Sequence, residues 1–152
     1  KCGILMFEKP PFSKEEEAKI LAAIKDAEKD TSGEIRIHIE KKCKEDPYTD
    51  AVKAFERLKM TKTKQRNGVL ILVALEDHKF AIVGDKGINE KVSDSFWDET
   101  KDLMIAHFKE GRIADGIVEG ILDAGAQLKQ FFPYQSNDIN ELNDDISYGK
   151  ND

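Results

Sequence analysis

The stretch that decides the fold is Val69-Leu70-Ile71-Leu72-Val73-Ala74-Leu75, an uninterrupted apolar run that follows Asn67-Gly68. Its length and its β-branched residues predict a strand buried on both faces, and therefore a strand inside a sheet. A short link over Glu76-Asp77-His78 leads into Lys79-Phe80-Ala81-Ile82-Val83-Gly84. Because the link is tight, these two strands are expected to form an antiparallel hairpin. The apolar run is far shorter than the roughly 20 residues that cross a bilayer, so no membrane span is expected.

Upstream of the hairpin, Glu34-Ile35-Arg36-Ile37-His38-Ile39-Glu40 alternates between polar and β-branched residues, which is typical of a strand with one buried face. A helix is expected over residues 14–29, because Ser13 and Glu16 form a capping-box pattern ahead of apolar residues at helical spacing. A second helix is expected after residue 47, ending among the basic residues 59–66. Because a helix joins them, the strands before and after it are expected to run parallel through a right-handed crossover.

Two further helices are predicted downstream, over residues 93–108 and 113–128. The second contains Gly116, Gly120 and Gly125, which are costly inside a helix unless they allow close packing against a neighbouring helix. The predicted fold class is α/β. We expect a three-layer α/β/α sandwich with a small mixed sheet and about four helices.

Composition describes a single acidic domain. The chain has 152 residues, of which 39% are apolar and 36% are charged, with a formal net charge of -6. This length supports a real core, and the negative charge argues against nucleic acid as a partner. Cys2 and Cys43 lack the spacing of a disulfide framework or a zinc site.

Three segments are expected along the chain. Residues 1–12 are expected to be an N-terminal stub, in part left over from expression, with Met6 as the native start. Residues 13–132 would form the folded domain. Residues 133–152, in which acids and small polar residues dominate, would form an acidic flexible tail. A monomer is expected.

Strand polarity indicates where a functional site can lie. The starts of the strands at residues 34 and 69 and the end of the strand at residue 84 should share one end of the sheet. Loops at that end carry Glu34, Asp85, Glu90 and Asp94. Oxygen ligands of this kind suit a hard cation, Ca²⁺ or Mg²⁺. The alternative is that these carboxylates are solvated caps, since the chain has 30 acidic residues and no EF-hand spacing.

Basic residues at the end of the second helix, among them Lys64 and Arg66, are expected at the same end of the sheet. Cations beside a metal-bound carboxylate are suited to binding a phosphate ester. The alternative is an ordinary solvated helix end. His38, His78 and His107 show no ligand spacing and are interpreted as structural or exposed, and no nucleophile elbow or phosphate-binding loop is present.

Four ordered blocks of the sequence resemble the TPM domain family, whose members include a thylakoid acid phosphatase, a photosystem II repair protein and an acetylcholine-receptor modulator. These blocks are residues 32–37, 66–73, 80–88 and 111–117. The resemblance covers residues 13 to 132 and implies an α/β/α sandwich. It also implies binding of a divalent cation, calcium above all, and in some members a weak acid phosphatase activity.

Matched block by block, the resemblance assigns metal ligation or its support to Glu34, Asn67, Asp85, Ser93 and Asp94. The match departs from the family at one of these positions, where many members carry a tyrosine in place of Asp85. Many bacterial members also have a leader and a membrane anchor. Neither is seen in this sequence, so a soluble, cytoplasmic bacterial member is expected.

The sequence leaves two functions open. The first is a domain that holds Ca²⁺ or Mg²⁺ through loop carboxylates and hydrolyses phosphomonoesters weakly. The second is a non-catalytic interaction or assembly module in which a metal only orders the loops. The expected partners are a divalent metal ion and either a phosphoester or another protein.

Overall fold

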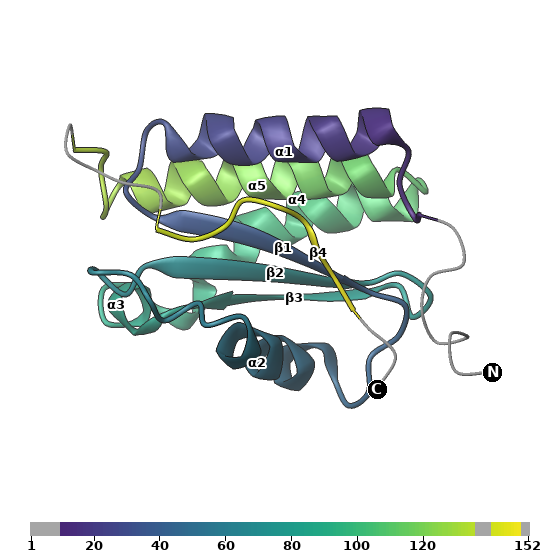
Figure 1. Ribbon diagram of the computed structural model, residues 1–152, viewed down its shortest axis with the longest axis horizontal. Coiled ribbons are helices and arrows are strands. Elements are labelled where there is room, and N and C mark those ends of the chain that lie inside the picture. The colour runs from purple at the N-terminus through teal and green to yellow at the C-terminus, as the bar shows by residue number, and fades with distance from the viewer. Residues whose placement is uncertain (1–9, 136–140, 150–152) are drawn as a thin grey trace.

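The sheet lies between two layers of helices (Figure 1) in a computed structural model that describes residues 10–135 and 141–149. Its strands are β1 (Glu34–Glu40), β2 (Gly68–Ala74), β3 (Lys79–Gly84) and β4 (Ser147–Tyr148), in the order β3-β2-β1-β4. β1 pairs in parallel with β2 and β4, whereas β2 and β3 are antiparallel. The predicted inner strand, parallel crossover and hairpin are therefore confirmed.

Three helices cover one face of the sheet and one helix covers the other (Figure 1). The first layer contains α1 (Lys14–Glu28), α4 (Asp98–Lys109) and α5 (Ile113–Lys129), and α2 (Pro47–Arg57) lies under β2 and β3. This arrangement confirms the predicted α/β/α sandwich. α2 ends earlier than predicted, because Lys59 takes a positive φ of 58° that ends the helical path.

Two short helices fill the connection between β3 and α4. They are α3 (Lys86–Asn89) and a 3₁₀ turn, η2 (Asp94–Trp97). The expectation of one helix over residues 93–108 therefore changes into a 3₁₀ turn followed by α4. The Asp85 side chain caps α3 by accepting the Lys86 N–H, which gives this acid a local structural role.

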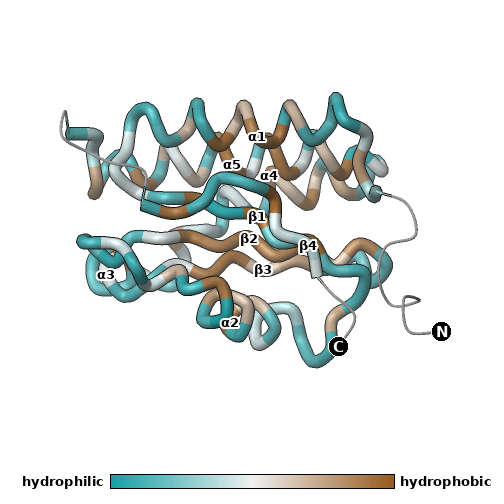
Figure 2. Tube along the Cα trace, in the orientation of Figure 1, coloured by the Kyte–Doolittle hydropathy of each residue, from teal (hydrophilic) through white to brown (hydrophobic). Residues whose placement is uncertain are grey.

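The core has two halves because side chains on a strand alternate between faces. Ile35, Ile37 and Ile39 of β1 pack toward α1 and α5. Leu70 and Leu72 of β2 pack toward α2. Every residue of β2 is buried, and Figure 2 shows the corresponding brown traces in the middle of the molecule.

The glycines of α5 allow the close packing that the sequence predicts. A Cβ atom at Gly120 would lie 2.6 Å from Met104 Sδ on α4, and one at Gly125 would lie 2.7 Å from Ala27 Cβ on α1. Both distances are too short for an alanine without rearrangement. Small residues on α5 thus bring this helix close to both of its neighbours.

The end of the chain corrects the prediction of an acidic flexible tail over residues 133–152. Residues 141–149, here called the C-terminal strap, lie along the outer edge of β1, where β4 sets Ser147 opposite His38. The Gly149 N–H donates to Ile39 O at 2.7 Å, and the Tyr148 hydroxyl donates to Glu17 of α1 at 2.5 Å. The acids of this segment obscured its apolar side chains, which pack on the core: Leu142, Ile146 and Tyr148.

The predicted domain limits also shift at both ends. Phe12, assigned to the N-terminal stub, is buried in the core, and Pro133 bridges to Thr31. The rest of the predicted stub, with the suggested start at Met6, lies outside the described residues, as do 136–140 and 150–152. Within the described chain, the model contains no helix that is both long and apolar enough to span a membrane.

Candidate functional site

Three strand ends form a row at the end of the sheet that the sequence singles out. Glu34 begins β1 opposite Gly68 of β2, and the Asp85 N–H, just beyond β3, donates to Gly68 O at 2.9 Å. Gly68 therefore separates the two acids. Two strand spacings amount to about 10 Å, and Met60 covers the gap, since its carbonyl would lie 3.0 Å from a Cβ at Gly68. The backbone positions are neighbours, but the two carboxylates point to different partners.

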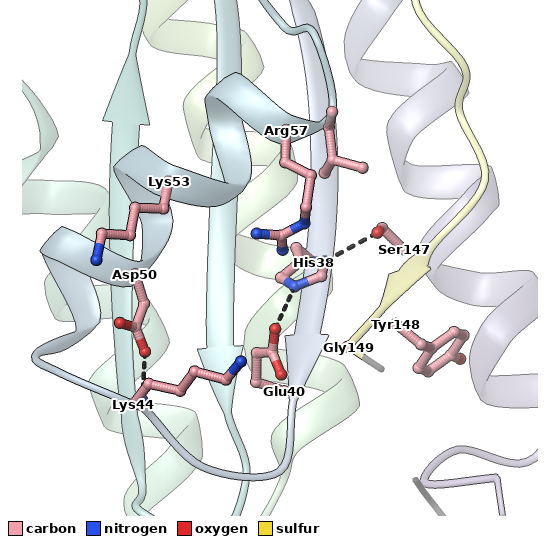
Figure 3. Close-up of a pocket in the computed structure, with 10 residues that line it drawn as sticks. His38, Glu40, Lys44, Asp50, Lys53, Arg57, Ser147, Tyr148 and Gly149 are labelled. Carbon is pink, nitrogen blue, oxygen red and sulfur yellow. Dashed lines mark hydrogen bonds and ion pairs between the residues drawn. The ribbon is translucent and has the colours of Figure 1, made fainter. Parts of the chain in front are cut away.

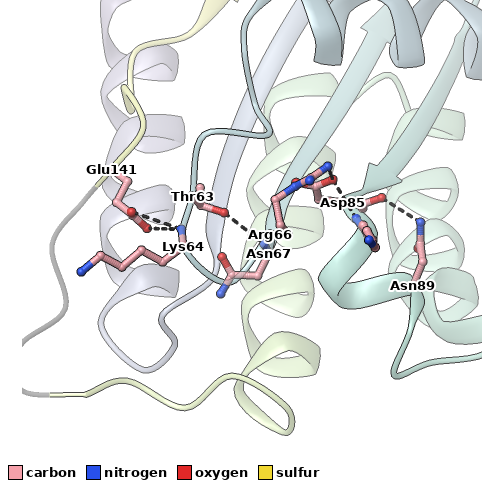
Figure 4. A network of polar contacts seen from close by, with 9 residues as sticks. Thr63, Lys64, Arg66, Asn67, Asp85, Asn89 and Glu141 are labelled. Atoms are coloured by element: carbon pink, nitrogen blue, oxygen red, sulfur yellow. Dashed lines mark hydrogen bonds and ion pairs between the residues drawn. The ribbon is translucent and has the colours of Figure 1, made fainter.

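Asp85 forms an ion pair with Arg66 (Figure 4). Arg66 Nε donates to one carboxylate oxygen at 2.8 Å and Nη2 donates to the other at 3.0 Å. The Asp85 side chain is only 5% exposed, whereas the Arg66 side chain is 43% exposed. Hydrogen bonding to Asp85 raises the pKa of Arg66, and the charges of Asp85 and Glu90 add to the increase. Two carboxylates thus act on one guanidinium.

Hydroxyl and amide groups fix the loop that carries Arg66. The Asn67 N–H donates to Thr63 Oγ1 at 3.2 Å, and Asn67 Nδ2 donates to Ser32 Oγ at 3.3 Å. Gln65 Nε2 also donates to Ser32 Oγ, at 2.9 Å. Arg66 itself has a positive φ of 51°, a conformation that costs free energy unless contacts hold it. The side chain of Asn67, which is buried, provides one of these contacts.

Glu34 is held by the backbone of the C-terminal strap. Its two carboxylate oxygens accept the N–H groups of Glu141, at 2.9 Å, and Leu142, at 2.5 Å. The Glu141 carboxylate in turn accepts the Lys64 N–H (Figure 4). Burial raises the pKa of Glu34 to about 7, and the two backbone hydrogen bonds oppose that increase. Glu34 is thus a buried acid that titrates near neutral pH.

A second acid, which is half-buried, lies near Glu34. Glu28, at the end of α1, accepts the Ile35 N–H at 3.0 Å. Burial raises the pKa of Glu28 to about 8, and the nearby charges of Asp144 and Glu34 add to the increase. The strap therefore brings acids together where the sequence predicted an unattached tail.

The other predicted site residues are distributed around the end of the sheet that carries Glu34 and Asp85. Glu90 is exposed at the C-terminal end of α3, and Lys64 is exposed on the loop before β2. Asp94 and Ser93 line a cavity of about 270 Å³ together with Gly84 and Asn89, the residues just before Asp85 and Glu90. The structure therefore associates Asp85 with Arg66 and Glu90 and keeps Asp94 beside the same segment, whereas the Glu34 carboxylate faces the strap.

The donor set at Asp85 suits a hard cation in its chemistry. In residues 10–135 and 141–149, no three His, Cys, Asp or Glu side chains are arranged as a metal-binding group. Asp85 and Glu90 nevertheless provide two carboxylates that act on one partly exposed guanidinium. Mg²⁺ is commonly held by one or two carboxylates together with several waters. A two-carboxylate site thus fits such an ion, provided that Arg66 leaves Asp85.

The polar face of β1 holds a second arrangement (Figure 3) that the sequence reading missed. His38 is buried, and its two ring nitrogens lie 2.8 Å from Ser147 Oγ and 2.7 Å from Glu40 Oε2. These residues line a cavity of about 470 Å³ between β1, α2 and the strap. Nearby, the buried Nε of Arg36 has no hydrogen-bond partner in the described part of the chain. The alternation along β1 was the one sequence signal for this polar face. Its partner Ser147 lies 109 residues from His38, so the contact itself left no local pattern.

The sequence model of the TPM domain matches residues 10–127. The chain belongs to the TPM domain family. No curated protein matches the sequence significantly. Because the match ends at residue 127, the C-terminal strap of this TPM domain lies outside the matched region.

Solved structures agree with this assignment. The NMR structure of the BA42 protein from the psychrophilic bacterium Bizionia argentinensis is 49% identical, with a TM-score of 0.88, and the alignment covers 94% of this chain and 99% of that chain. The N-terminal domain of a P. gingivalis protein is 20% identical with a TM-score of 0.65, covering 80% and 78% of the two chains. The N-terminal domain of the cg2496 protein from Corynebacterium glutamicum is 16% identical with a TM-score of 0.63, covering 91% and 95%. The last two similarities show the fold alone.

Proposed function

We propose that this TPM domain binds a divalent cation, Ca²⁺ or Mg²⁺, at Asp85, with Glu90 as the second carboxylate. One observation carries the proposal: the buried Asp85 carboxylate is neutralised by a guanidinium that is 43% exposed. An exposed counter-charge can move into water at little cost, since it is already partly hydrated. The buried carboxylate cannot move in this way, so it needs another cation when Arg66 leaves.

The proposal gives Arg66 the role of an internal counter-ion that competes with the metal. Both oxygens of Asp85 are occupied by Arg66, so the metal and the guanidinium exclude one another. The Coulombic effect of Glu90 on Arg66 indicates that a cation replacing Arg66 would feel both acids. Asn67 would support this site through the loop, as its hydrogen bonds to Thr63 and Ser32 suggest.

A released Arg66 also offers a route to binding a phosphate ester. Its guanidinium matches a phosphate in geometry and charge, and the exposed Lys64 lies on the same loop. When bound, the metal would add positive charge that polarises the ester. The proposed activity is therefore a weak hydrolysis of phosphomonoesters that depends on the cation.

The non-catalytic alternative is favoured because the hydroxyl groups near Asp85 already take part in structural hydrogen bonds. Ser32 Oγ already accepts hydrogen bonds from Gln65 and Asn67, and Thr63 Oγ1 accepts one from Asn67. In the described residues, no hydrogen bond links an imidazole to either hydroxyl. In this alternative, the cation orders the loops around Asp85, and a protein partner binds the ordered surface.

Titration with CaCl₂ and MgCl₂, followed by amide NMR, tests the cation site. We expect shifts concentrated at residues 66–68 and 84–90. Asp85→Asn should abolish these shifts, and Arg66→Gln should lower the Kd about tenfold by removing the competitor. Asp102→Asn, at an exposed acid of α4, is the matched control and should bind as the unchanged protein does. Shifts confined to the strap and Glu28 would reject the Asp85 site in favour of the other acids.

Hydrolysis of p-nitrophenyl phosphate separates the two functions. Cation-dependent turnover that is lost in Asp85→Asn would support the phosphatase. Cation binding without turnover would select the interaction module. Turnover that persists in Asp85→Asn with a chelator would contradict metal-assisted hydrolysis at Asp85.

A further inference from the structure

We propose that Ser147, His38 and Glu40 form a nucleophile–base–acid relay that hydrolyses small anionic carboxylic esters in the cavity between β1, α2 and the C-terminal strap. This activity is separate from the proposed cation site at Asp85 and does not depend on it. The relay includes a residue of the strap, beyond the part of the chain that matches the family.

The hydrogen bonds define a direction for proton transfer. An ionised carboxylate only accepts hydrogen bonds, so the contact of 2.7 Å between Glu40 and His38 Nε2 places the ring proton on Nε2. Nδ1 then carries a lone pair that accepts the Ser147 hydroxyl at 2.8 Å. A nucleophile bonded to a base, with the base oriented by a third group, is the arrangement that activates a serine. Here Nδ1, rather than Nε2, faces the serine.

The fold holds all three groups on rigid elements. Ser147 is the register partner of His38, and Glu40 lies two positions further along β1, on the same face as His38. The strap is fixed at this point by the Gly149 N–H on Ile39 O and by the Tyr148 hydroxyl on Glu17. The His38 side chain is only 2% exposed, so neighbouring atoms restrict its rotation. Such restraint keeps the serine and its base in contact.

The cavity beside Ser147 is suited to an anionic substrate. Its volume of about 470 Å³ is within the usual range for small-molecule sites. Lys44, Lys53 and Arg57 line it, against the carboxylates of Glu40 and Asp50. Asp50 accepts the N–H groups of Lys44 and Glu45, and Lys53 is paired with Glu45.

Arg57 is the group best placed to receive the substrate's negative charge. Figure 3 shows its guanidinium beside His38. Among the described residues it makes no hydrogen bond or ion pair, so its charge is available to a ligand. It would hold the carboxylate of the substrate or the oxygen that becomes negative during attack.

The reaction balances without a cofactor. Ser147 Oγ forms a bond to the carbonyl carbon while its proton passes to His38 Nδ1. The bond between that carbon and the alkoxy oxygen then breaks, and Nδ1 returns the proton to the departing alcohol. A water molecule next gives a proton to Nδ1 and its oxygen to the acyl carbon. The bond between that carbon and Ser147 Oγ then breaks and Nδ1 returns the proton to Oγ, which releases the acid and restores Ser147. Glu40 stabilises the imidazolium formed in both steps.

A merely structural pair would show the same distances, so the test must measure reactivity. The purified full chain is treated with a fluorophosphonate probe, with and without EDTA, and the adduct is located by peptide mass mapping. We expect one adduct per chain, on Ser147, at the same rate in EDTA. Ser147→Ala should abolish it, and His38→Gln should slow it at least about 100-fold. The exposed Ser95 provides the internal control and should stay unmodified.

Absence of an adduct, or an adduct that survives His38→Gln, would overturn the proposal. His38 is buried and its replacement could unfold the chain, so a second measurement uses Ser147→Cys. If His38 acts as a base, iodoacetamide should alkylate position 147 at least about tenfold faster than Cys43 at pH 7, because an imidazole favours the thiolate. Equal rates at the two positions would also overturn it.

Substrate preference tests the role of Arg57. The p-nitrophenyl half-ester of succinic acid should be hydrolysed at least about tenfold faster, in kcat/KM, than p-nitrophenyl acetate. Arg57→Gln should remove this preference, so that the two esters are hydrolysed at similar rates. Hydrolysis lost in Ser147→Ala but retained in Asp85→Asn would support the relay whatever the outcome at the cation site. Equal rates for the two esters would reject an anionic substrate.

Discussion

Glu34 and Asp85 are two buried acids at the same end of one sheet, but their carboxylates have different hydrogen-bond donors. Asp85 accepts two hydrogen bonds from Arg66 and therefore has a full positive charge beside it. Glu34 accepts two backbone N–H groups from the strap, and its pKa rises to about 7. Backbone dipoles offset part of the cost of burying a carboxylate, whereas a cation supplies an opposite full charge.

This difference separates two roles for buried acids. Asp85 is paired with a group that can be exchanged for another cation, which is why the proposed metal site lies there. Glu34 is linked to the strap, and its protonation is linked to the stability of the fold. The predictions below test each half of this comparison, beginning with the largest expected effect.

Removing the C-terminal strap should have the largest effect. A chain ending at residue 140 loses the N–H donors of Glu34 and the packing of three partly buried side chains, namely Leu142, Ile146 and Tyr148. We expect the free energy of unfolding in urea to fall by about 4 kcal/mol. A chain ending at residue 149 is the control and should retain its stability. A loss below about 1 kcal/mol would mean that the strap contributes little to holding Glu34.

Raising the pH should destabilise the fold through Glu28 and Glu34. Their pKa values rise from 4.5 to about 8 and about 7 on folding, so the folded state holds protons that the unfolded chain releases. Stability from these groups is present below about pH 4.5 and is lost as the pH rises through 7 and 8. We expect a loss of about 3 kcal/mol between pH 5.5 and pH 8.5, less than the two pKa shifts alone would give, because solvent screens the partly exposed Glu28.

Urea denaturation across this pH range provides the measurement, and Glu28→Gln the comparison. The amide can accept the Ile35 N–H and donate to Asp144, so this variant should flatten the pH profile and gain stability at pH 8.5. A profile identical to that of the unchanged protein would show that Glu28 is not one of the responsible groups.

Removing the Arg66 guanidinium should lower the free energy of unfolding by less than these changes do. Arg66→Gln leaves the buried Asp85 carboxylate without its counter-charge, and we expect a loss of about 2 kcal/mol in the absence of divalent ions. Millimolar CaCl₂ or MgCl₂ should restore most of this loss, measured as a rise in Tm. If neither ion restores stability, Asp85 is not a cation ligand.

Removing the acid should have the smallest effect. Asp85→Asn leaves Arg66, which is 43% exposed, free to hydrate, and the amide oxygen can still accept the Lys86 N–H. We expect a loss of about 1 kcal/mol, with no response of Tm to either ion. A loss larger than that of Arg66→Gln would reverse the assigned asymmetry and show that Asp85 acts mainly as a structural cap.

Most of the fold could be predicted from the sequence, because its decisive signals are local. The apolar run at 69–75, the alternation at 34–40 and the glycines of α5 each depend on residues close together in the chain. Strand polarity then placed Glu34 and Asp85 at one end of the sheet. The one-turn helix α3 escaped prediction, and η2 was expected as the first turn of the following helix, because a single turn is too short to create a periodicity of its own.

The strap and its contacts could not be predicted in this way. Its acids indicated a flexible tail, while the contacts that hold it, Ser147 with His38 and Glu141 with Glu34, join residues more than 100 positions apart. Nor could the sequence reveal that Arg66 would form an ion pair with Asp85, since β2 and β3 separate the two residues in the chain. Such pairs form only when the sheet has brought their elements together.

The sequence by itself determined the layers of this protein, its strand order through β3-β2-β1 and its family, because hydrophobic periodicity acts over a few residues at a time. Only the tertiary structure decided which acid has a cation, which acid keeps its proton and which serine meets His38. Those outcomes depend on burial and on atoms a few ångströms away in space, and neither is written in the order of the residues.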